Sequence, residues 1–135
     1  LSAPGDPAMQ AAFDKARRTL NYFLDVAESR PPDTRGFALK VGVAEQDQIE
    51  FFWVYPFQRE EDGFSGRISS EPELLNSVFK GQVIEFDRSQ IVDWTFEDQA
   101  TKIMHGNYTG CVLLQREAPE YAAQFQELYG LNCDK

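Results

Sequence analysis

Apolar residues recur every three or four positions between residues 9 and 27, which is the period of an amphipathic α-helix. Asp6 and Pro7 stand just before this run and are typical of the cap and the first residue of a helix. Two consecutive prolines at positions 31–32 would end it. The pattern therefore predicts a long N-terminal helix of about five turns.

The period changes to two after this helix, as in β-strands. Residues 37–43 form a first alternating run, and residues 49–57 form a second run that is apolar on both faces. We therefore expect the second run to be a central strand covered on both sides, with Phe51 and Trp53 packed in the core. One face of this strand carries five large side chains: Ile49, Phe51, Trp53, Tyr55 and Phe57.

Further along the chain, the polar turn at 59–63 predicts a third strand that returns beside the second. A short central helix is then predicted over residues 70–81. Ser70 followed by Glu73 is a capping-box pattern, and Gly81 would end the helix. The residues between them include four apolar side chains at helical spacing: Leu74, Leu75, Val78 and Phe79.

Two more strands are predicted over residues 82–86 and 91–97. On the second of these strands, Trp94 lies on the apolar face and Asp93 points to the opposite face. Residues 108–115 are apolar without a clear period, so a sixth strand is predicted there and a helix remains the alternative.

A last helix is predicted from Pro119 to Gly130. The complete order is a helix, three antiparallel strands, a short helix, two or three more strands and this helix. It indicates an α+β fold, with N-terminal, central short and C-terminal helices packed on a mostly antiparallel sheet of five to six strands. A chain of 135 residues fits a single domain over residues 1–135.

Composition narrows the possible partners. The chain has 22 acidic and 13 basic residues and a formal net charge of −9. Such a surface repels phosphate groups, so nucleic acid is not an expected partner, whereas a basic toxin or enzyme would be attracted. No run approaches the roughly 18 apolar residues of a membrane-spanning helix, so we expect no membrane insertion.

Cys111 and Cys133 leave two interpretations open. A disulfide between them would close a loop of 22 positions and contribute about 3 kcal/mol to stability. Otherwise, Cys111 is a buried thiol and Cys133 a thiol of the polar tail in a reducing cytoplasm. The even count favours the disulfide.

The sequence begins with Leu1 rather than methionine, as after removal of a signal peptide or trimming of a longer chain. Together with the cysteine pair, this start favours a periplasmic or secreted protein. A cytoplasmic protein is the alternative.

Few residues have the pattern of a catalytic site. The chain has one histidine, no glycine-rich phosphate loop and no nucleophile elbow, so we expect neither a metal nor a cofactor. Asp93 and His105 are the candidate catalytic pair, with Cys111 as a possible nucleophile beside them. We favour a simpler interpretation, in which His105 lies at a turn or strand start and Asp93 accepts backbone or indole hydrogen bonds.

An aromatic groove is the second kind of candidate site. Trp53, Trp94 and Tyr108 could receive a ligand or a side chain of a partner. The candidate binding residues are Trp53, Glu71, Asp93, Trp94, His105, Asn107 and Tyr108. Four of them are expected to converge at one end of the sheet: Asp93, His105, Asn107 and Tyr108.

Six short motifs in a fixed order carry a family resemblance. They are Phe52-Trp53, Gly63-Phe64-Ser65-Gly66, Glu71-Pro72, Gly81-Gln82-Val83-Ile84, Asp93-Trp94 and Gly106-Asn107-Tyr108-Thr109. In this combination, residues 9–128 resemble the YegJ-like bacterial domain of unknown function. The resemblance implies a bacterial source and a compact α+β fold, with no established activity. Some members of that family look like envelope proteins.

The leading hypothesis is a non-catalytic protein-binding domain of the bacterial envelope, of the inhibitor or immunity type, which covers a basic toxin or enzyme. Small size, strong acidity and the scarcity of catalytic groups favour it over an enzyme. Two alternatives remain: a small hydrolase that uses Asp93 and His105 in a groove near Trp94, and a ligand-binding carrier with an aromatic pocket.

Overall fold

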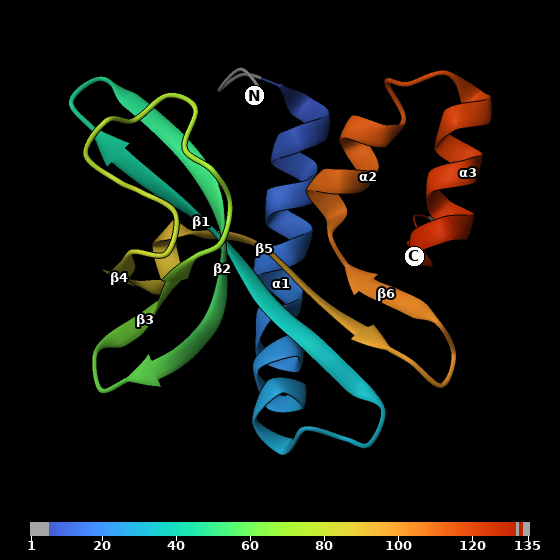
Figure 1. Ribbon diagram of the computed structural model, residues 1–135, viewed down its shortest axis with the longest axis horizontal. Coiled ribbons are helices and arrows are strands. Elements are labelled where there is room, and N and C mark those ends of the chain that lie inside the picture. The colour runs from blue at the N-terminus through green and yellow to red at the C-terminus, as the bar shows by residue number, and fades with distance from the viewer. Residues whose placement is uncertain (1–5, 132, 134–135) are drawn as a thin grey trace. The chain divides into compact units, whose positions relative to one another are not determined.

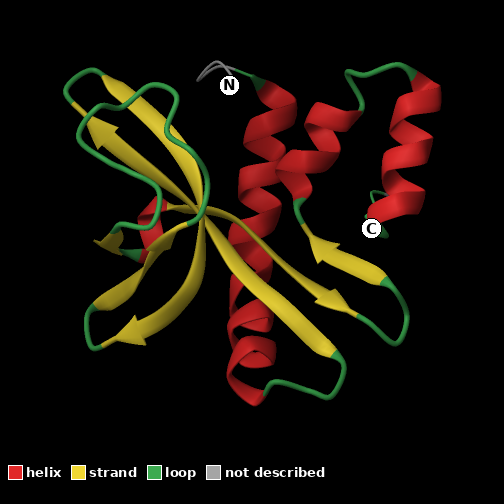
Figure 2. Ribbon diagram, in the orientation of Figure 1, coloured by secondary structure: helices red, strands yellow, loops and turns green. Residues whose placement is uncertain are grey.

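The computed structural model describes residues 6–131 and 133 of the chain (Figures 1 and 2). In chain order the elements are α1 (Pro7–Ser29), β1 (Thr34–Glu45), β2 (Gln48–Glu60), β3 (Gly63–Ile68), β4 (Val83–Phe86), the 3₁₀ turn η1 (Arg88–Gln90), β5 (Ile91–Asp98), β6 (Ile103–Gly106), α2 (Tyr108–Leu114) and α3 (Pro119–Tyr129). The predicted α+β class is confirmed. Leu1 and most of the predicted polar tail lie outside the described residues.

The strands form one sheet in the order β4-β3-β2-β1-β5-β6. The pairs β1–β2, β2–β3, β3–β4 and β5–β6 are antiparallel, in agreement with the predicted sheet. The sixth strand is β6, and the apolar residues after it form the helix α2. The strand predicted over residues 108–115 is therefore wrong, because an apolar run without a period does not distinguish a strand from a helix.

Contacts within the chain divide it into two compact units. The hairpin unit comprises residues 38–92, and the helical unit comprises residues 6–37 and the described part of residues 93–135. The strand β1 begins in the helical unit and ends in the hairpin unit. The expectation of a single domain over residues 1–135 stays a prediction.

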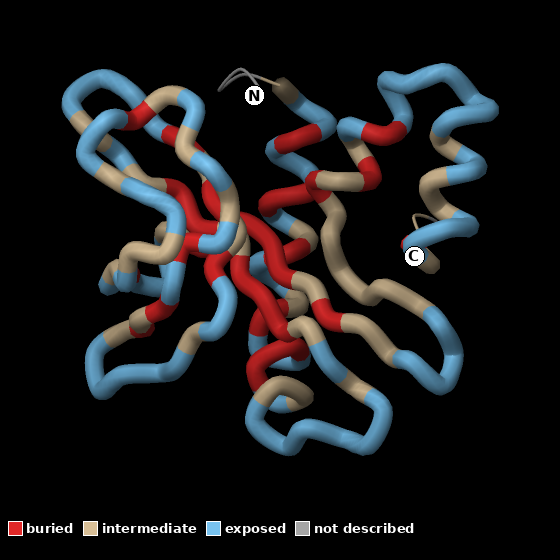
Figure 3. Tube along the Cα trace, viewed as in Figure 1, coloured by how far each residue is buried: buried red, intermediate tan, exposed pale blue. Residues whose placement is uncertain are grey.

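The helix α1 supplies much of the core of the helical unit. Its cap is Asp6, as predicted, and the carboxylate accepts hydrogen bonds from the N–H groups of Ala8 (3.1 Å) and Met9 (3.3 Å). Buried and exposed positions alternate along α1 (Figure 3), and the buried Phe23 ring stacks on Trp94 at a centroid distance of 5.1 Å. None of the described helices is long and apolar enough to cross a membrane.

The core of the hairpin unit includes two side chains of β2. Phe52 and Val54 are both 0% exposed, and Phe52 packs with Ile68 of β3 and with Leu75. These two residues lie on the face of β2 opposite Phe51 and Trp53. The core therefore forms on the face of β2 that carries the fewer large side chains.

The other face of β2 presents a row of four side chains, named the β2 row below: Ile49, Phe51, Trp53 and Tyr55. Ile49 is 48% and Tyr55 50% exposed, whereas Phe51 and Trp53 are partly buried. The expectation that this face is covered, with Phe51 and Trp53 in the core, is therefore wrong. Alternation assigns residues to two faces, but it cannot identify the inner face when both are apolar.

Phe57 does not continue the β2 row, although the sequence pattern placed it there. The register shifts between Val54, which pairs with Ile68, and Phe57, which pairs with Gly66. This bulge inserts one extra residue into β2 and turns Phe57 to the face of Val54. The β2 row therefore ends at Tyr55.

The segment between β3 and β4 is irregular (Figure 2), so the central helix predicted over residues 70–81 is wrong. Both residues of the predicted capping box are bonded elsewhere. Ser70 Oγ accepts a hydrogen bond from the N–H of Trp53 (3.0 Å), and the N–H of Glu73 donates to the Glu50 carboxylate (2.8 Å). Partners distant in the sequence thus replace the local bonds of a helix start.

Glu50 fastens this segment from a buried position on β2, where it is 5% exposed. Its carboxylate accepts hydrogen bonds from the N–H groups of Glu73 (2.8 Å), Leu74 (2.9 Å) and Leu75 (3.0 Å). Burial raises the pKa of the Glu50 carboxyl, but the three donors outweigh burial and hold the pKa below its ordinary value. The ionised carboxylate therefore stabilises this part of the fold.

We predict that Glu50→Gln lowers the free energy of unfolding by about 1 to 3 kcal/mol, because the amide NH₂ replaces one carboxylate oxygen and then faces at least one N–H donor that has lost its acceptor. The depressed pKa of Glu50 also predicts a pH dependence in the wild type. Its contribution is complete above the ordinary pKa of 4.5 and is lost as the pH falls through the lower folded value. Urea denaturation at pH 7 and below pH 4 measures both effects.

Glu61→Gln is the matched control, because Glu61 is exposed in the turn after β2. Its substitution should change the free energy of unfolding by less than about 0.5 kcal/mol. Equal stabilities of Glu50→Gln and the wild type at pH 7 would contradict the role given to Glu50.

Candidate functional site

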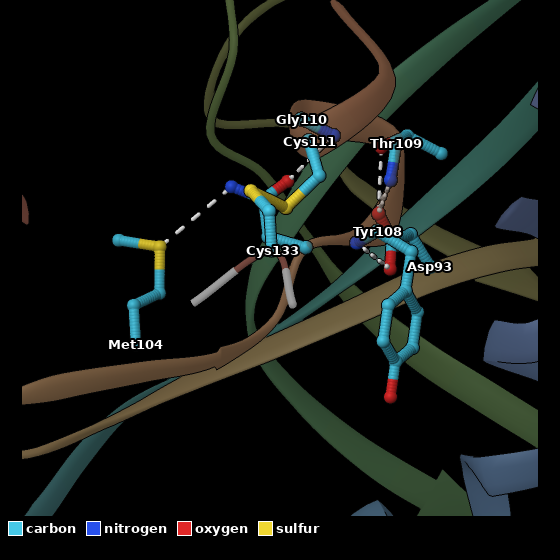
Figure 4. Close-up of a disulfide and its surroundings, with 8 residues drawn as sticks. Asp93, Met104, Tyr108, Thr109, Gly110, Cys111 and Cys133 are labelled. Carbon is cyan, nitrogen blue, oxygen red and sulfur yellow. Dashed lines mark hydrogen bonds between the residues drawn. A yellow bond between two sulfur atoms is a disulfide. The ribbon is translucent and has the colours of Figure 1, made fainter. Parts of the chain in front are cut away.

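Asp93 lies on β5 and is 0% exposed. Its Oδ1 atom accepts hydrogen bonds from the N–H groups of Trp94 (2.9 Å) and Tyr108 (3.2 Å). Its Oδ2 atom accepts from the N–H (2.9 Å) and the Oγ1 hydroxyl (2.6 Å) of Thr109 (Figure 4). Four donors from two segments of the helical unit therefore converge on one carboxylate.

This arrangement determines what Asp93 can do. An ionised carboxylate offers about four lone-pair sites, and four donors already use them. Three of the four donors belong to the first two residues of α2, where a negative charge also interacts favourably with the helix dipole. Asp93 is thus placed to anchor α2 to β5 rather than to accept a proton from a substrate.

His105 lies in a different environment. It is opposite Phe96 in the β5–β6 register, and its ring stacks on Phe96 at a centroid distance of 4.7 Å. Because Phe96 is three positions after Asp93 on β5, the two side chains point to opposite faces. The structure therefore does not form the Asp93–His105 pair that the hydrolase alternative needs.

Trp94 is a core residue. It is 2% exposed, and its indole N–H donates to Thr19 Oγ1 of α1 at 3.0 Å. The ring of Tyr108 meets Trp94 edge-on at a centroid distance of 5.6 Å, and Lys15 Nζ lies 4.9 Å from the centre of the Tyr108 ring. Tyr108 is partly exposed, whereas Trp94 is buried.

The Gly106-Asn107 turn explains one of the shared motifs. Gly106 has a φ of +76°, and a Cβ atom there would overlap the Trp94 carbonyl oxygen and ring, so no other residue fits without rearrangement. Asn107 (φ +54°) donates its N–H to the same oxygen (2.7 Å), and its side chain accepts from the N–H of Gly110 (3.2 Å). The Gly-Asn-Tyr-Thr motif thus describes a strand-to-helix connection.

The predicted binding residues are divided between the two units. Asp93, Trp94, Asn107 and Tyr108 come together in the helical unit through the contacts described above, and His105 stands apart from Asp93 on Phe96. Trp53 and Glu71 belong to the hairpin unit. Of the described residues, no three histidine, cysteine or carboxylate side chains are arranged to ligate a metal.

Sequence reasoning missed the roles of Thr109 and Glu50. Thr109 is 0% exposed and gives Asp93 two of its four hydrogen bonds. The available signal was a charged residue inside an apolar strand pattern, which holds for both Asp93 and Glu50. Such a residue requires buried donors, although its position alone does not identify them.

Cys111 of α2 and Cys133 form a disulfide with their Cα atoms 5.5 Å apart (Figure 4). This is the pairing that the sequence analysis favoured, and it removes Cys111 as a nucleophile. Cys111 also packs with Leu114 and Leu131 in a small buried cluster. None of the described residues of α3 is buried (Figure 3), so the disulfide and this cluster hold the chain on both sides of that helix.

In the hairpin unit, the β2 row is an exposed apolar feature, and Phe79 and Val83 are further apolar residues, exposed by 63% and 57%. Trp53 faces Lys40 across the β1–β2 pair, and the Lys40 ammonium lies 5.7 Å from the centre of the indole ring. Glu71 is exposed in the irregular segment after β3. The row offers an apolar contact surface.

Comparison with known proteins supports the resemblance read from the motifs. The model of a family described as an uncharacterized protein conserved in bacteria (DUF2314) matches residues 6–133. The Uncharacterized protein YegJ of Escherichia coli (strain K12) is 31% identical over 121 residues, which cover 87% of this chain and 76% of that protein. The search of solved structures found no match.

We predict that Asp93→Asn destabilises the protein by about 2 to 3 kcal/mol, because the amide cannot accept all four hydrogen bonds and no longer carries the charge. Glu97→Gln is the control on the same strand, since Glu97 is 42% exposed and forms a surface ion pair with Arg35 (3.0 Å). It should cost at most about 1 kcal/mol. Chemical denaturation measures both, and equal losses would contradict the anchoring role of Asp93.

We also predict that replacing Cys111 and Cys133 together by serine lowers stability by about 3 kcal/mol. Hydrogen exchange should then accelerate most in residues 115–131, because α3 lacks buried residues of its own. Dithiothreitol should have the same effect on the wild type and none on the double variant. An unchanged melting temperature of the reduced wild type would contradict this prediction.

Proposed function

The chain belongs to the DUF2314 family of uncharacterized bacterial proteins, and we propose that it is a non-catalytic, protein-binding domain of the bacterial envelope. Its partner is a basic protein, and its action is of the inhibitor or immunity type. The observation that carries the proposal is the β2 row, an apolar surface on a strand of an otherwise highly charged chain.

The β2 row has the composition of a protein interface. Two aromatic residues, Trp53 and Tyr55, are of the types that contribute most to binding energy. Ile49 and Tyr55 are about half exposed, at 48% and 50%, so a partner would bury new apolar area there. The strand itself is rigid, because Phe52 and Val54 fix its inner face in the core.

Charge supports a basic partner. Residues 38–92, which form the hairpin unit, contain ten acidic and five basic side chains. A negative field of this kind accelerates the approach of a basic protein and disfavours acidic ones. The apolar row would then provide the close contact after the charges have brought the two proteins together.

Two features of the helical unit are consistent with a binding role in the envelope. The donors around Asp93 leave its carboxylate no free site for proton transfer, which favours binding over hydrolysis. The Cys111–Cys133 disulfide is of the kind that persists in oxidising compartments.

The test is affinity capture from an envelope extract of the source bacterium, with the wild type and the double variant Ile49→Ser/Tyr55→Ser as baits. We expect basic proteins on the wild type at low salt and at least tenfold less of them on the double variant, because the loss of two interface side chains at about 1 kcal/mol each exceeds a factor of ten. Quantitative mass spectrometry measures the difference.

Leu128→Ser on α3 is the control, because Leu128 is 76% exposed and lies in the other unit. It should capture the same proteins as the wild type. Capture of no protein at low salt, or equal capture by all three baits, would count against the proposal.

A further inference from the structure

The strand β4 is the last strand at one edge of the sheet. The N–H of Ile68 in β3 donates to the carbonyl of Gln82 (2.9 Å), so these two residues form a hydrogen-bonded pair. Such pairs alternate along an antiparallel ladder, so the next residue, Val83, and then Glu85 direct their N–H and C=O groups away from β3. The outer edge of β4 therefore presents backbone donors and acceptors.

The two edges of the sheet differ. At the opposite edge, the N–H of Met104 in β6 bonds to the carbonyl of Gly130 (2.8 Å), and Met104 forms a parallel bridge with Leu131. The C-terminal segment thus covers β6. On β4 the Val83 side chain is 57% exposed, and Glu85 is exposed as well.

A cavity of about 350 Å³ adjoins β4 at the end of the β3–β4 pair. Phe64 and Phe86 are among its lining residues; both are 5% exposed, and their rings stack at a centroid distance of 5.5 Å. Four acidic residues also line it: Glu60, Asp62, Glu85 and Asp87. Neither lysine nor arginine lines this cavity among the described residues, and the Arg59 guanidinium lies 5.9 Å from the centre of the Phe64 ring.

Two of these carboxylates are already engaged. Glu60 accepts hydrogen bonds from Ser65 Oγ (2.6 Å) and Gln58 Nε2 (2.8 Å), and Asp87 accepts from the N–H of Ser89 (2.9 Å). Within the described part of the chain, Asp62 and Glu85 take part in no hydrogen bond or ion pair. Their carboxylate oxygens are therefore available to bind a cation.

We infer that the β4 edge binds an extended segment of a basic polypeptide as an additional strand, with a lysine or arginine side chain of that segment in the acidic cavity. Main-chain bonds to Val83 and Glu85 would supply affinity, and the cavity would select the positive charge. This inference rests on the proposed function, because it specifies how a basic partner is held.

The first test uses a fluorescein-labelled octapeptide of alternating lysine and threonine, titrated with the full chain at low salt and followed by fluorescence anisotropy. We expect binding of this peptide and at least tenfold weaker binding of the glutamate–threonine analogue. No binding of the lysine peptide, or equal binding of both peptides, would overturn the inference.

Two further analogues test strand addition itself, one N-methylated on every lysine and the other on every threonine of the backbone. An added strand uses alternate N–H groups, so one analogue should lose at least tenfold in affinity and the other should lose little. Equal affinities of the two analogues, whether retained or lost, would show that charge alone attracts the peptide and would overturn the inference.

The matched protein variants are Val83→Pro and Val83→Thr. Proline removes only the outward N–H, which an edge strand tolerates, whereas threonine keeps that N–H. We expect at least tenfold weaker peptide binding by Val83→Pro and unchanged binding by Val83→Thr. If Val83→Pro does not fold, as judged by circular dichroism, the two N-methylated peptides decide the question.

The proposed function, which uses the β2 row, and the inference about the β4 edge can be contradicted independently. If Val83→Pro captures the partner as the wild type does while Ile49→Ser/Tyr55→Ser does not, the edge inference is wrong and the proposed function stands. If the lysine peptide binds the β4 edge but no basic protein is captured from the extract, the proposed function is wrong and the edge site stands.

Discussion

The helical unit depends on one buried charge, the carboxylate of Asp93. A charge inside a protein is costly unless hydrogen bonds and charge partners replace water, and at this position backbone groups and one hydroxyl provide four of them. To provide them, the chain must turn sharply after β6 and begin a helix at once. The positive φ angles of Gly106 and Asn107 follow from this requirement, and so does the place of Cys111 one turn later.

The hairpin unit uses the same device. Glu50 lies inside a strand, as Asp93 does, and binds three consecutive N–H groups of a segment that has no regular structure of its own. In each unit a carboxylate on a strand therefore fixes the conformation of a connecting segment by accepting its backbone hydrogen bonds. The secondary-structure propensity of that segment alone would not determine this conformation. Both carboxylates accept backbone hydrogen bonds, so Asp93, the catalytic candidate of the sequence, is already engaged by structural donors.

The elements that the sequence predicts correctly are those determined by residues close together in the chain. The period and cap of α1 and the hairpin β1–β2 needed only neighbouring residues. The helix expected at 70–81 failed because its capping residues bond to Trp53 and Glu50, which the local pattern cannot reveal. The inner face of β2 was misassigned because both faces are apolar. Asp93 and Tyr108, two of the four residues predicted to converge, are joined by a hydrogen bond. The role of Asp93 also depends on Thr109, whose hydroxyl a local pattern cannot assign to it.

The disulfide affects how freely the sequence of α3 can change. Because α3 has no fully buried residue among those described and is flanked by the covalently fixed Cys111 and Cys133, its retention depends on few of its own side chains, chiefly Ala122 and Phe125, which pack against the cluster of Cys111. Most positions of α3 can therefore change without a large loss of stability. The helix is a segment in which new surface properties can arise at little cost, whereas the Gly106–Cys111 connection tolerates almost no change.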